Sequence, residues 1–238
     1  MKYFNLIIYV ALFLALFSCN NNLETKEEKQ YPEINTYEQI DSLLNTFEHV
    51  AFDEMDIRYM EATGYDKTYR GKLHGKLILK IFKEDINKNL VGLFPIKCFL
   101  SKGVDYEQLM NGGDAFTYLI IDKKLIYKIL ELQNILRERK LNHNGFWVRD
   151  GHRAPNWNYR RGGVDGSRHI RGEAVDIIVG DVNMNEKADK EDKEILLKIL
   201  NEEVIKNEGG IGRYPESMVI HFDTRGYGAR WDHQRKRE

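Results

Sequence analysis

The residues that decide the fold of this chain are Gly166-Ser167-Arg168-His169-Ile170-Arg171-Gly172-Glu173-Ala174-Val175-Asp176-Ile177-Ile178-Val179. A histidine and an aspartate, two residue types that can share one metal ion, stand on either side of Gly172. A single helix would hold His169 and Asp176 about 10 Å apart, at about 1.5 Å of rise per residue, which is too far for one ion. Gly172 and the β-branched residues after it favour a turn that leads into a buried strand, so that His169 meets Asp176. A purely structural hydrogen-bonded pair is the alternative.

A second polar pair lies about fifty residues later, in Ser217-Met218-Val219-Ile220-His221-Phe222-Asp223-Thr224-Arg225-Gly226. The two-residue period of a strand places Val219, His221 and Asp223 on one face and the apolar residues between them on the other. His221 is therefore the expected third ligand beside His169 and Asp176. Two histidines and one carboxylate with an open fourth position are the arrangement that catalytic zinc uses to hold water.

Several motifs together resemble the zinc D-alanyl-D-alanine carboxypeptidase and murein endopeptidase family, which is related in fold to lysostaphin-type peptidases and the hedgehog signalling domain. They are S-x-H-x-x-G-x-A-x-D from Ser167 to Asp176, Gly209-Gly210-Ile211-Gly212-Arg213-Tyr214-Pro215, H-x-D at His221 and Asp223, and the closing Arg230-Trp231. The resemblance runs from about Leu119 to Trp231. It implies zinc on His169, Asp176 and His221, and cleavage of peptide bonds in cell-wall peptidoglycan.

The fold that this resemblance implies is α+β, with a small antiparallel sheet and flanking helices in a zinc peptidase domain over residues 114–238. The segment 37–113 is expected to be an accessory α+β region, which either positions the enzyme on its wall substrate or supports the packing of the C-terminal half. Within the peptidase domain, apolar residues recur at helical spacing after Asp122, a predicted N-cap, so that Lys123 to Lys140 is predicted to be an amphipathic helix.

The segment Gly151-His152-Arg153-Ala154-Pro155-Asn156-Trp157-Asn158 resembles the one that precedes the first zinc ligand in the family. Two positions depart from the family pattern, because Asp150 stands where serine is usual and His152 where an aromatic residue is usual. Arg153 matches the arginine that, in the family, binds the substrate carbonyl or terminal carboxylate. A surface arginine is the alternative interpretation.

The sequence offers more than one candidate for the general base. Many relatives carry an acidic residue three positions before the last histidine ligand, where this chain has Met218. Asp223 shares a predicted strand face with His221, and is the candidate either for the base or for a residue that orients the water or the ligand. Glu216 is the reserve candidate, with a surface carboxylate as its alternative. Ser167 is expected to form a hydrogen bond within the site loop.

Calcium is a second candidate cofactor, bound directly after the Asp176 strand. Oxygen-bearing side chains recur there with the spacing of a calcium loop, and the expected ligands are Asp181, Asn183, Asn185, Lys187 through its carbonyl, Asp189 and Asp192. Glu186 replaces the usual turn glycine, and Asp192 replaces the usual glutamate. The alternative is a solvated acidic loop before the next helix.

The N-terminal residues predict export. An apolar run from Leu6 to Phe17 follows Lys2 and is shorter than the about 20 residues that span a bilayer, which favours a secretory signal over residues 1–18. Leu16-Phe17-Ser18-Cys19 resembles a lipoprotein processing box, in which Cys19 carries the lipid. Residues 19–36 are predicted to be a flexible tether. The protein is therefore expected to be an exported lipoprotein, anchored to a membrane on its periplasmic or outer-surface side.

Charge and cysteine content narrow the function classes. Lys and Arg number 36 against 37 Asp and Glu, a net charge of −1, so no overall field favours nucleic acid. Without Cys19, only Cys98 remains, which excludes an intramolecular disulfide in the mature chain. Two classes stay open: a lipid-anchored zinc peptidase that trims or cuts peptidoglycan stem peptides, either as a D,D-carboxypeptidase or as a murein endopeptidase, and a catalytically silent zinc-containing protein that binds the wall or a partner.

Overall fold

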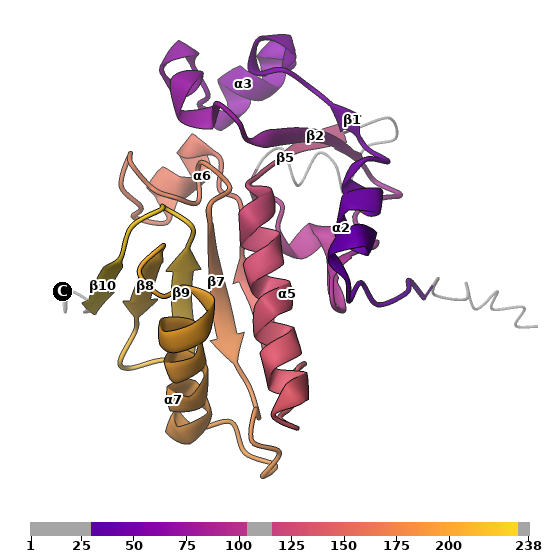
Figure 1. Ribbon diagram of the computed structural model, residues 1–238. Coiled ribbons are helices and arrows are strands. Elements are labelled where there is room, and N and C mark those ends of the chain that lie inside the picture. Colours follow the sequence, from indigo (N-terminus) through magenta and orange to yellow (C-terminus); the bar gives the residue numbers. More distant parts are fainter. Residues whose placement is uncertain (1–29, 104–115, 233–238) are drawn as a thin grey trace, which may run out of the picture. The chain divides into compact units, whose positions relative to one another are not determined.

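The computed structural model describes residues 30–103 and 116–232, and the described residues from 31 onward form one compact unit (Figure 1). The predicted signal peptide, Cys19 and the first part of the predicted tether lie outside the described residues. Ile34, within the predicted tether, exchanges two backbone hydrogen bonds with Gly92 and is 9 % exposed. None of the helices within the described ranges has the length and hydropathy needed to cross a membrane.

The C-terminal half is built on a five-stranded sheet in the order β10-β8-β9-β7-β6. Its strands are β6 (Phe146–Asp150), β7 (Ala174–Val179), β8 (Gly210–Arg213), β9 (Val219–Asp223) and β10 (Ala229–Asp232). All neighbours are antiparallel except β10 and β8, which are parallel at one edge. The α+β class and the largely antiparallel sheet predicted from the sequence are confirmed.

Two faces of this sheet differ in polarity because of the two-residue period of its strands. Val175 and Ile177 of β7 and Ile220 and Phe222 of β9 are fully buried in the main apolar core. The residues between them lie on the opposite face, where Asp176 pairs directly with His221. The apolar residues thus determine which face remains for polar side chains.

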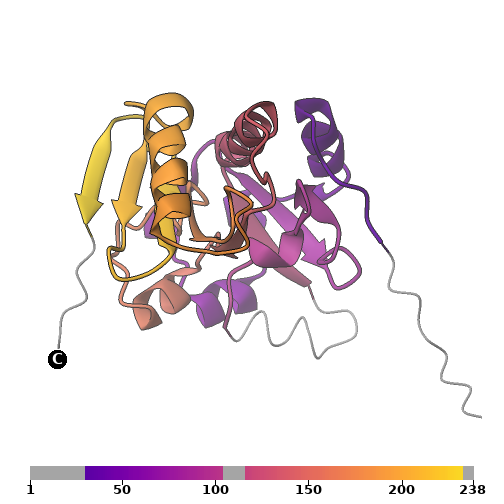
Figure 2. The same ribbon diagram turned by 90° about the horizontal axis from the view of Figure 1, so that it is seen from below.

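Helices cover the apolar face. Helix α5 (Lys123–Glu138) begins where predicted, after Asp122, whose side chain accepts a hydrogen bond from the amide of Lys124. Helix α7 (Lys190–Ile199) continues into a π-helical turn, η5 (Leu200–Val204). Figure 2 shows α5 and α7 on one side of the sheet and the short helix α6 (Pro155–Arg160) on the other. The polar face is therefore the side covered by α6 and its loops.

The N-terminal segment contains a second sheet in the order β1-β2-β5, from Glu48–His49, Leu77–Phe82 and Phe116–Ile121, and a hairpin of β3 (Asn89–Val91) and β4 (Phe94–Pro95). Its α-helices are α2 (Tyr37–Leu44) and α3 (Ile57–Thr63), and its 3-10 turns are η1 (Phe52–Glu54), η2 (Lys67–Tyr69), η3 (Gly71–Leu73) and η4 (Ile96–Cys98). Cys98 lies in the turn η4, and Ile96, Phe99 and Leu100 beside it are fully buried.

One apolar core joins the two halves of the sequence. The same buried cluster contains Ile40, Leu79 and Phe99 from the N-terminal segment together with Val175 and Ile220 from the five-stranded sheet. The described part of the predicted accessory region, residues 37–103, thus packs into the core of the C-terminal half, and a role in positioning the enzyme on its wall substrate stays a prediction.

The turn at Gly172 packs closely against β5, and this close packing leads to a stability prediction. Gly172 has φ +64, and a Cβ there would lie 2.2 Å from the carbonyl oxygen of Ile120 in β5. Gly162 has a similar φ of +71, but nothing lies within 4 Å of its Cβ position. We expect Gly162→Ala to lower the free energy of unfolding by about 1 kcal/mol, from backbone strain alone.

Gly172→Ala should lower the free energy of unfolding by clearly more, because backbone atoms that cannot rotate away must also move. Urea unfolding of both variants measures the difference. Equal losses would show that β5 yields without cost at this contact.

Candidate metal centre

A row of paired residues crosses the polar face of the five-stranded sheet. Asp150 of β6 lies opposite Asp176 of β7, which lies opposite His221 of β9, and His221 in turn lies opposite Gly212 of β8. Trp231 of β10 completes the row beside Gly212. Directly paired residues project from the same face, with Cβ atoms about 4.5–5.5 Å apart, so this row brings four functional side chains together across strands far apart in sequence.

His169 reaches the row from the loop before β7. The turn at Gly172 closes with a hydrogen bond from its amide to the carbonyl of His169, and Ser167 Oγ accepts a bond from the His169 amide at 3.3 Å. Ser167 thus has the role within the site loop expected from the sequence. His169 is 3 % exposed, which places its ring inside the protein beside Asp176.

Three donor atoms form a nearly equilateral triangle. His169 Nε2 lies 3.2 Å from His221 Nδ1 and 3.2 Å from Asp176 Oδ1, and His221 Nδ1 lies 2.9 Å from Asp176 Oδ1. In tetrahedral zinc sites the ligands lie about 2.0–2.1 Å from the ion, which corresponds to about 3.3 Å between ligand atoms. The triangle therefore has the size of one face of such a tetrahedron. His169, Asp176 and His221 form the group suited to a metal ion among the described residues.

Hydrogen bonds on the far sides of both rings leave the inner nitrogens for a metal. His169 Nδ1 lies 2.7 Å from the carbonyl oxygen of Gly151, which can only accept, so Nδ1 carries the proton and Nε2 presents its lone pair. His221 Nε2 lies 3.2 Å from Asp223 Oδ2, which assigns its proton to Nε2 and its lone pair to Nδ1. Both lone pairs then face Asp176 Oδ1. In metal sites, hydrogen-bond partners on the outer ring nitrogens orient the histidine ligands in the same way.

Burial and charge favour the metal-binding protonation states at two of the ligands. Burial lowers the pKa of His169, which favours the neutral ring. Burial alone would raise the pKa of Asp176, but His169 and His221 hold it well below its usual range. For His221, burial lowers the pKa, whereas the bonds to Asp176 and Asp223 outweigh it and raise the pKa. Of the three ligands, His221 is therefore the one whose surroundings favour the charged form over the neutral ring.

Asp223 lies behind His221. Its Oδ1 accepts hydrogen bonds from the amides of Gly210 and Arg225 and from Arg225 Nε, while its Oδ2 accepts from Arg225 Nη2 and His221 Nε2. The side chain is fully buried. Burial would raise its pKa, but His221 and Arg225 lower it. Of the two roles left open by the sequence, this geometry fits the orientation of a ligand, because both oxygens are already occupied by donors.

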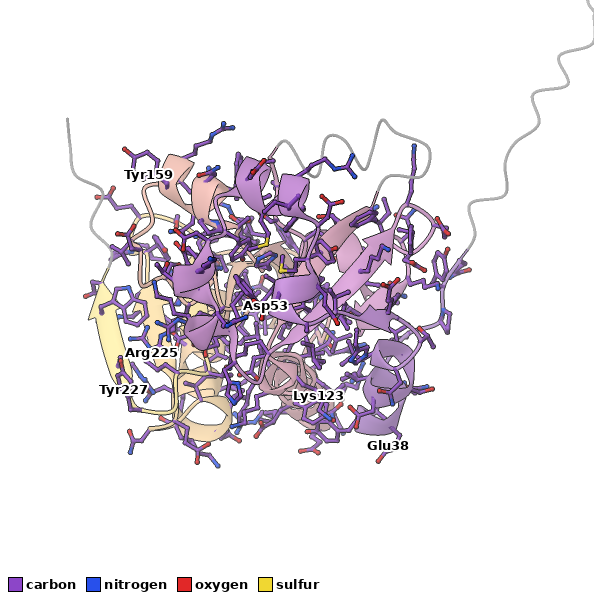
Figure 3. The ribbon with its side chains drawn as sticks, turned by 90° about the horizontal axis from the view of Figure 1, so that it is seen from above. Glu38, Asp53, Lys123, Tyr159, Arg225 and Tyr227 are labelled. Atoms are coloured by element: carbon purple, nitrogen blue, oxygen red, sulfur yellow. The ribbon has the colours of Figure 1, made fainter. Side chains whose placement is uncertain are left out.

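Arg225 also links the site to its aromatic edge. Its guanidinium carbon lies 4.9 Å from the ring centroid of Trp231 and 5.7 Å from that of Tyr227, and Figure 3 shows Arg225 and Tyr227 side by side. The Trp231 ring lies 5.2 Å from the His221 ring, over Gly212, where a Cβ would come within 2.7 Å of the indole. Gly212 thus provides the space for an aromatic wall beside the ligand.

Arg153 lies within the site, as the family motif predicts. Its Nη2 donates a hydrogen bond to Asp150 Oδ2 at 2.9 Å and another to Asp176 Oδ2, the carboxylate oxygen that does not face the histidines. Burial would lower the pKa of Arg153, but Asp176 and Asp150 raise it, which keeps the guanidinium charged. Both of these bonds come from Nη2, and Nε is buried without a hydrogen-bond partner.

The other candidate bases lie elsewhere. Glu216 is exposed in the β8–β9 hairpin. Met218, which occupies the position of the acidic residue in many relatives, packs against the apolar core.

The predicted calcium loop is held by its own hydrogen bonds. Asp192 is fully buried and accepts hydrogen bonds from the amides of Val182, Asn183 and Asp189. The bond from the Asp189 amide is part of the capping box of helix α7. Asp181 accepts from the amides of Asn185 and Glu186, and Asn185 from that of Lys187. Asp189 and Asp192 thus cap helix α7, Asp181 forms turns within the loop, and calcium stays a prediction that the structure does not support.

Sequence reasoning missed the contribution of the N-terminal segment to this site. Tyr65 Oη lies 2.7 Å from His152 Nε2 and donates to the carbonyl of Ile170, next to His169. Burial lowers the pKa of His152 to about 3, so this ring is neutral. Lys76 binds Glu173 at 2.9 Å and Asp122 at 2.6 Å. No local pattern indicates these contacts, which join residues 46 to 105 positions apart.

A buried His–Asp–His set on one face of an antiparallel sheet, with the outer nitrogens of its rings hydrogen-bonded, is suited to hold one metal ion. Residues 126–223 match the family model described as peptidase M15, and this region of the chain is therefore similar to that family. The match contains the three predicted ligands together with Arg153 and Asp223. Neither a curated protein nor a solved structure matches the chain significantly.

The position of Asp223 predicts how its loss affects the site. Asp223→Asn should weaken zinc affinity by about ten- to a hundred-fold, because an amide accepts less strongly from His221 Nε2–H and leaves Arg225 without its charge partner. Competition with a chromophoric chelator measures this affinity, and excess zinc should restore the metal content.

Asp232→Asn is the matched control, since Asp232 forms an exposed ion pair with Arg213 at the edge strand. An Asp223→Asn protein that binds zinc as tightly as the Asp232→Asn protein would exclude the positioning role.

Proposed function

We propose that the protein is a zinc-dependent peptidase that hydrolyses peptide bonds in cell-wall peptidoglycan. The observation that carries the proposal is the triangle of His169 Nε2, His221 Nδ1 and Asp176 Oδ1, whose edges of 2.9 to 3.2 Å match one face of a zinc tetrahedron. The match of residues 126–223 to the peptidase M15 family model supports peptide hydrolysis, and the family resemblance supports murein peptides as the substrate.

The three ligands would hold zinc, which supplies Lewis acidity for the scissile carbonyl and lowers the pKa of water. Other residues of the chain orient the two histidine ligands and bind the substrate. Asp223 holds the His221 ring at its outer nitrogen, and the carbonyl of Gly151 holds that of His169. Arg153 is charged and lies beside Asp176, so we expect its guanidinium to bind an oxygen of the substrate, either the scissile carbonyl or a terminal carboxylate.

A catalytically silent wall-binding or partner-binding protein is the second candidate. Met218 favours it, because the acidic residue that many relatives carry at this position is replaced by a side chain packed in the core. The retained triangle and Arg153 favour the enzyme. The two candidates differ in one measurable property, which is the turnover of a wall peptide.

Digestion of purified peptidoglycan tests the enzyme. We expect the protein to release peptides that mass spectrometry identifies, to lose this activity in a chelator and to regain it when zinc is returned. Free D-alanine would indicate a carboxypeptidase, and conversion of cross-linked dimers to monomers would indicate an endopeptidase. His169→Ala should be inactive, whereas His143→Ala, at a half-buried histidine outside the metal centre, should remain active. Unchanged peptidoglycan with zinc-loaded parent protein would favour the silent candidate.

We also propose that the protein is exported and anchored to a membrane through a lipid on Cys19. The support is the apolar run before Leu16-Phe17-Ser18-Cys19, which resembles a lipoprotein processing box. Anchoring would hold the peptidase close to its wall substrate.

Cys19→Ser should abolish the anchor, because serine lacks the thiol that is acylated. We expect this variant to leave the membrane fraction and to lose incorporation of a labelled fatty acid. Cys98→Ser is the control, since Cys98 is a half-buried thiol of the folded unit, and it should behave as the parent protein. Equal membrane partition of both variants would place the anchor elsewhere.

A further inference from the structure

The β-bulge in β6 turns Asp150 toward the metal centre. Phe146, Trp147 and Val148 pair with Val179, Ile178 and Ile177, but Asp150 then pairs with Asp176, so that Arg149 is an extra residue on β6. Regular alternation would have placed Asp150 on the same face as Phe146 and Val148, which lie in the apolar core. Bulges next to active sites redirect side chains in this way.

Asp150 is buried there, and one of its carboxylate oxygens has no hydrogen-bond partner. Its side chain is 5 % exposed, and Oδ2 accepts a hydrogen bond from Arg153 Nη2 at 2.9 Å. Oδ1 is buried without a hydrogen-bond partner. Because the same Arg153 nitrogen also binds Asp176 Oδ2, a single guanidinium nitrogen separates the Asp150 carboxylate from the predicted ligand. A buried carboxylate oxygen without a donor is costly to fold, which calls for a function.

Two other carboxylates near the ligands, those of Asp223 and Glu173, already form hydrogen bonds or ion pairs within the protein. Asp223 is saturated by donors from Gly210, Arg225 and His221. Glu173 is paired with Arg168 at 2.8 Å and with Lys76 at 2.9 Å. Among the carboxylates described around the site, Asp150 is the one that lies on the ligand face and has an oxygen without a hydrogen-bond donor.

We propose that Asp150 is the general base of the reaction, an inference that rests on the proposed peptidase function. Asp150 Oδ1 accepts a proton from the attacking water as the water oxygen bonds to the scissile carbonyl carbon. The same proton then passes to the amide nitrogen as the carbon–nitrogen bond breaks, which yields a carboxylic acid and an amine. Asp150 thus takes the role that an acidic residue at the position of Met218 has in many relatives, and Arg153 orients it through Oδ2.

The test is Asp150→Asn, which keeps the shape and an oxygen for Arg153 but removes the proton acceptor. We expect kcat on a defined stem peptide to fall by about a hundred- to ten-thousand-fold, with little change in KM. Zinc content per chain, the calorimetric affinity for the product peptide and the melting temperature should stay at parental values. Asp53→Asn, at an exposed aspartate, is the control and should keep full activity.

Two further variants keep the test decisive. Asp150→Ser carries the residue usual in the family and replaces Asp150→Asn in the test if that variant does not fold. We expect the same loss of kcat from Asp150→Ser. In Asp150→Ala, added formate should restore part of kcat, because a small carboxylate can replace the missing proton acceptor.

A kcat of Asp150→Asn within about three-fold of the parent value would overturn the role of Asp150 but not the peptidase function. A loss of activity explained by a lower zinc content or by a higher KM would do the same. A zinc-loaded parent protein that cleaves no wall peptide would overturn both proposals. These outcomes separate the failure of the inference from the failure of the proposed function.

Discussion

The register between β7 and β9 is the constraint on which the rest of the site depends. It sets Asp176 opposite His221, and a slip of one residue would place an apolar side chain opposite the ligand and turn the polar residues into the core. Val175, Ile177, Ile220 and Phe222 prevent this slip, because they are buried only in the observed register. The hydrophobic face of the sheet thereby positions the chemistry of the other face.

The ionised Asp176 carboxylate inside the protein requires compensation, and it has partners on both oxygens. Oδ1 faces His169 and His221, and Oδ2 accepts from Arg153. A buried charge is tolerated when it is paired and hydrogen-bonded, whereas an unpaired one costs several kcal/mol. Arg153 therefore stabilises the buried carboxylate before any substrate arrives, which also keeps the carboxylate charged for a cation.

The N-terminal segment holds the loop that carries His169. Lys76 joins Glu173 to Asp122, which is also the N-cap of α5, and Tyr65 joins His152 to the carbonyl of Ile170. These contacts fix the loop on both sides of Gly172, where the chain passes against β5. Precise placement of a ligand demands such support from groups that do not touch the metal, and here it comes from a segment in which no catalytic motif is visible.

The sequence by itself determined the features that depend on neighbouring residues. The apolar period of β7 and β9, the N-cap at Asp122 and the turn at Gly172 follow from local spacing and backbone freedom, and so does the proximity of His169, Asp176 and His221 once the motif is placed on strands. Tertiary structure alone decided what each carboxylate does. Asp223 shares a face with His221 in both views, but only the positions of Gly210 and Arg225 show that its oxygens are occupied. Asp150 belongs to the core by strand alternation, and only the bulge at Arg149 turns it toward the ligands, because a bulge is set by pairing with another strand and leaves no mark in the alternation of a single one.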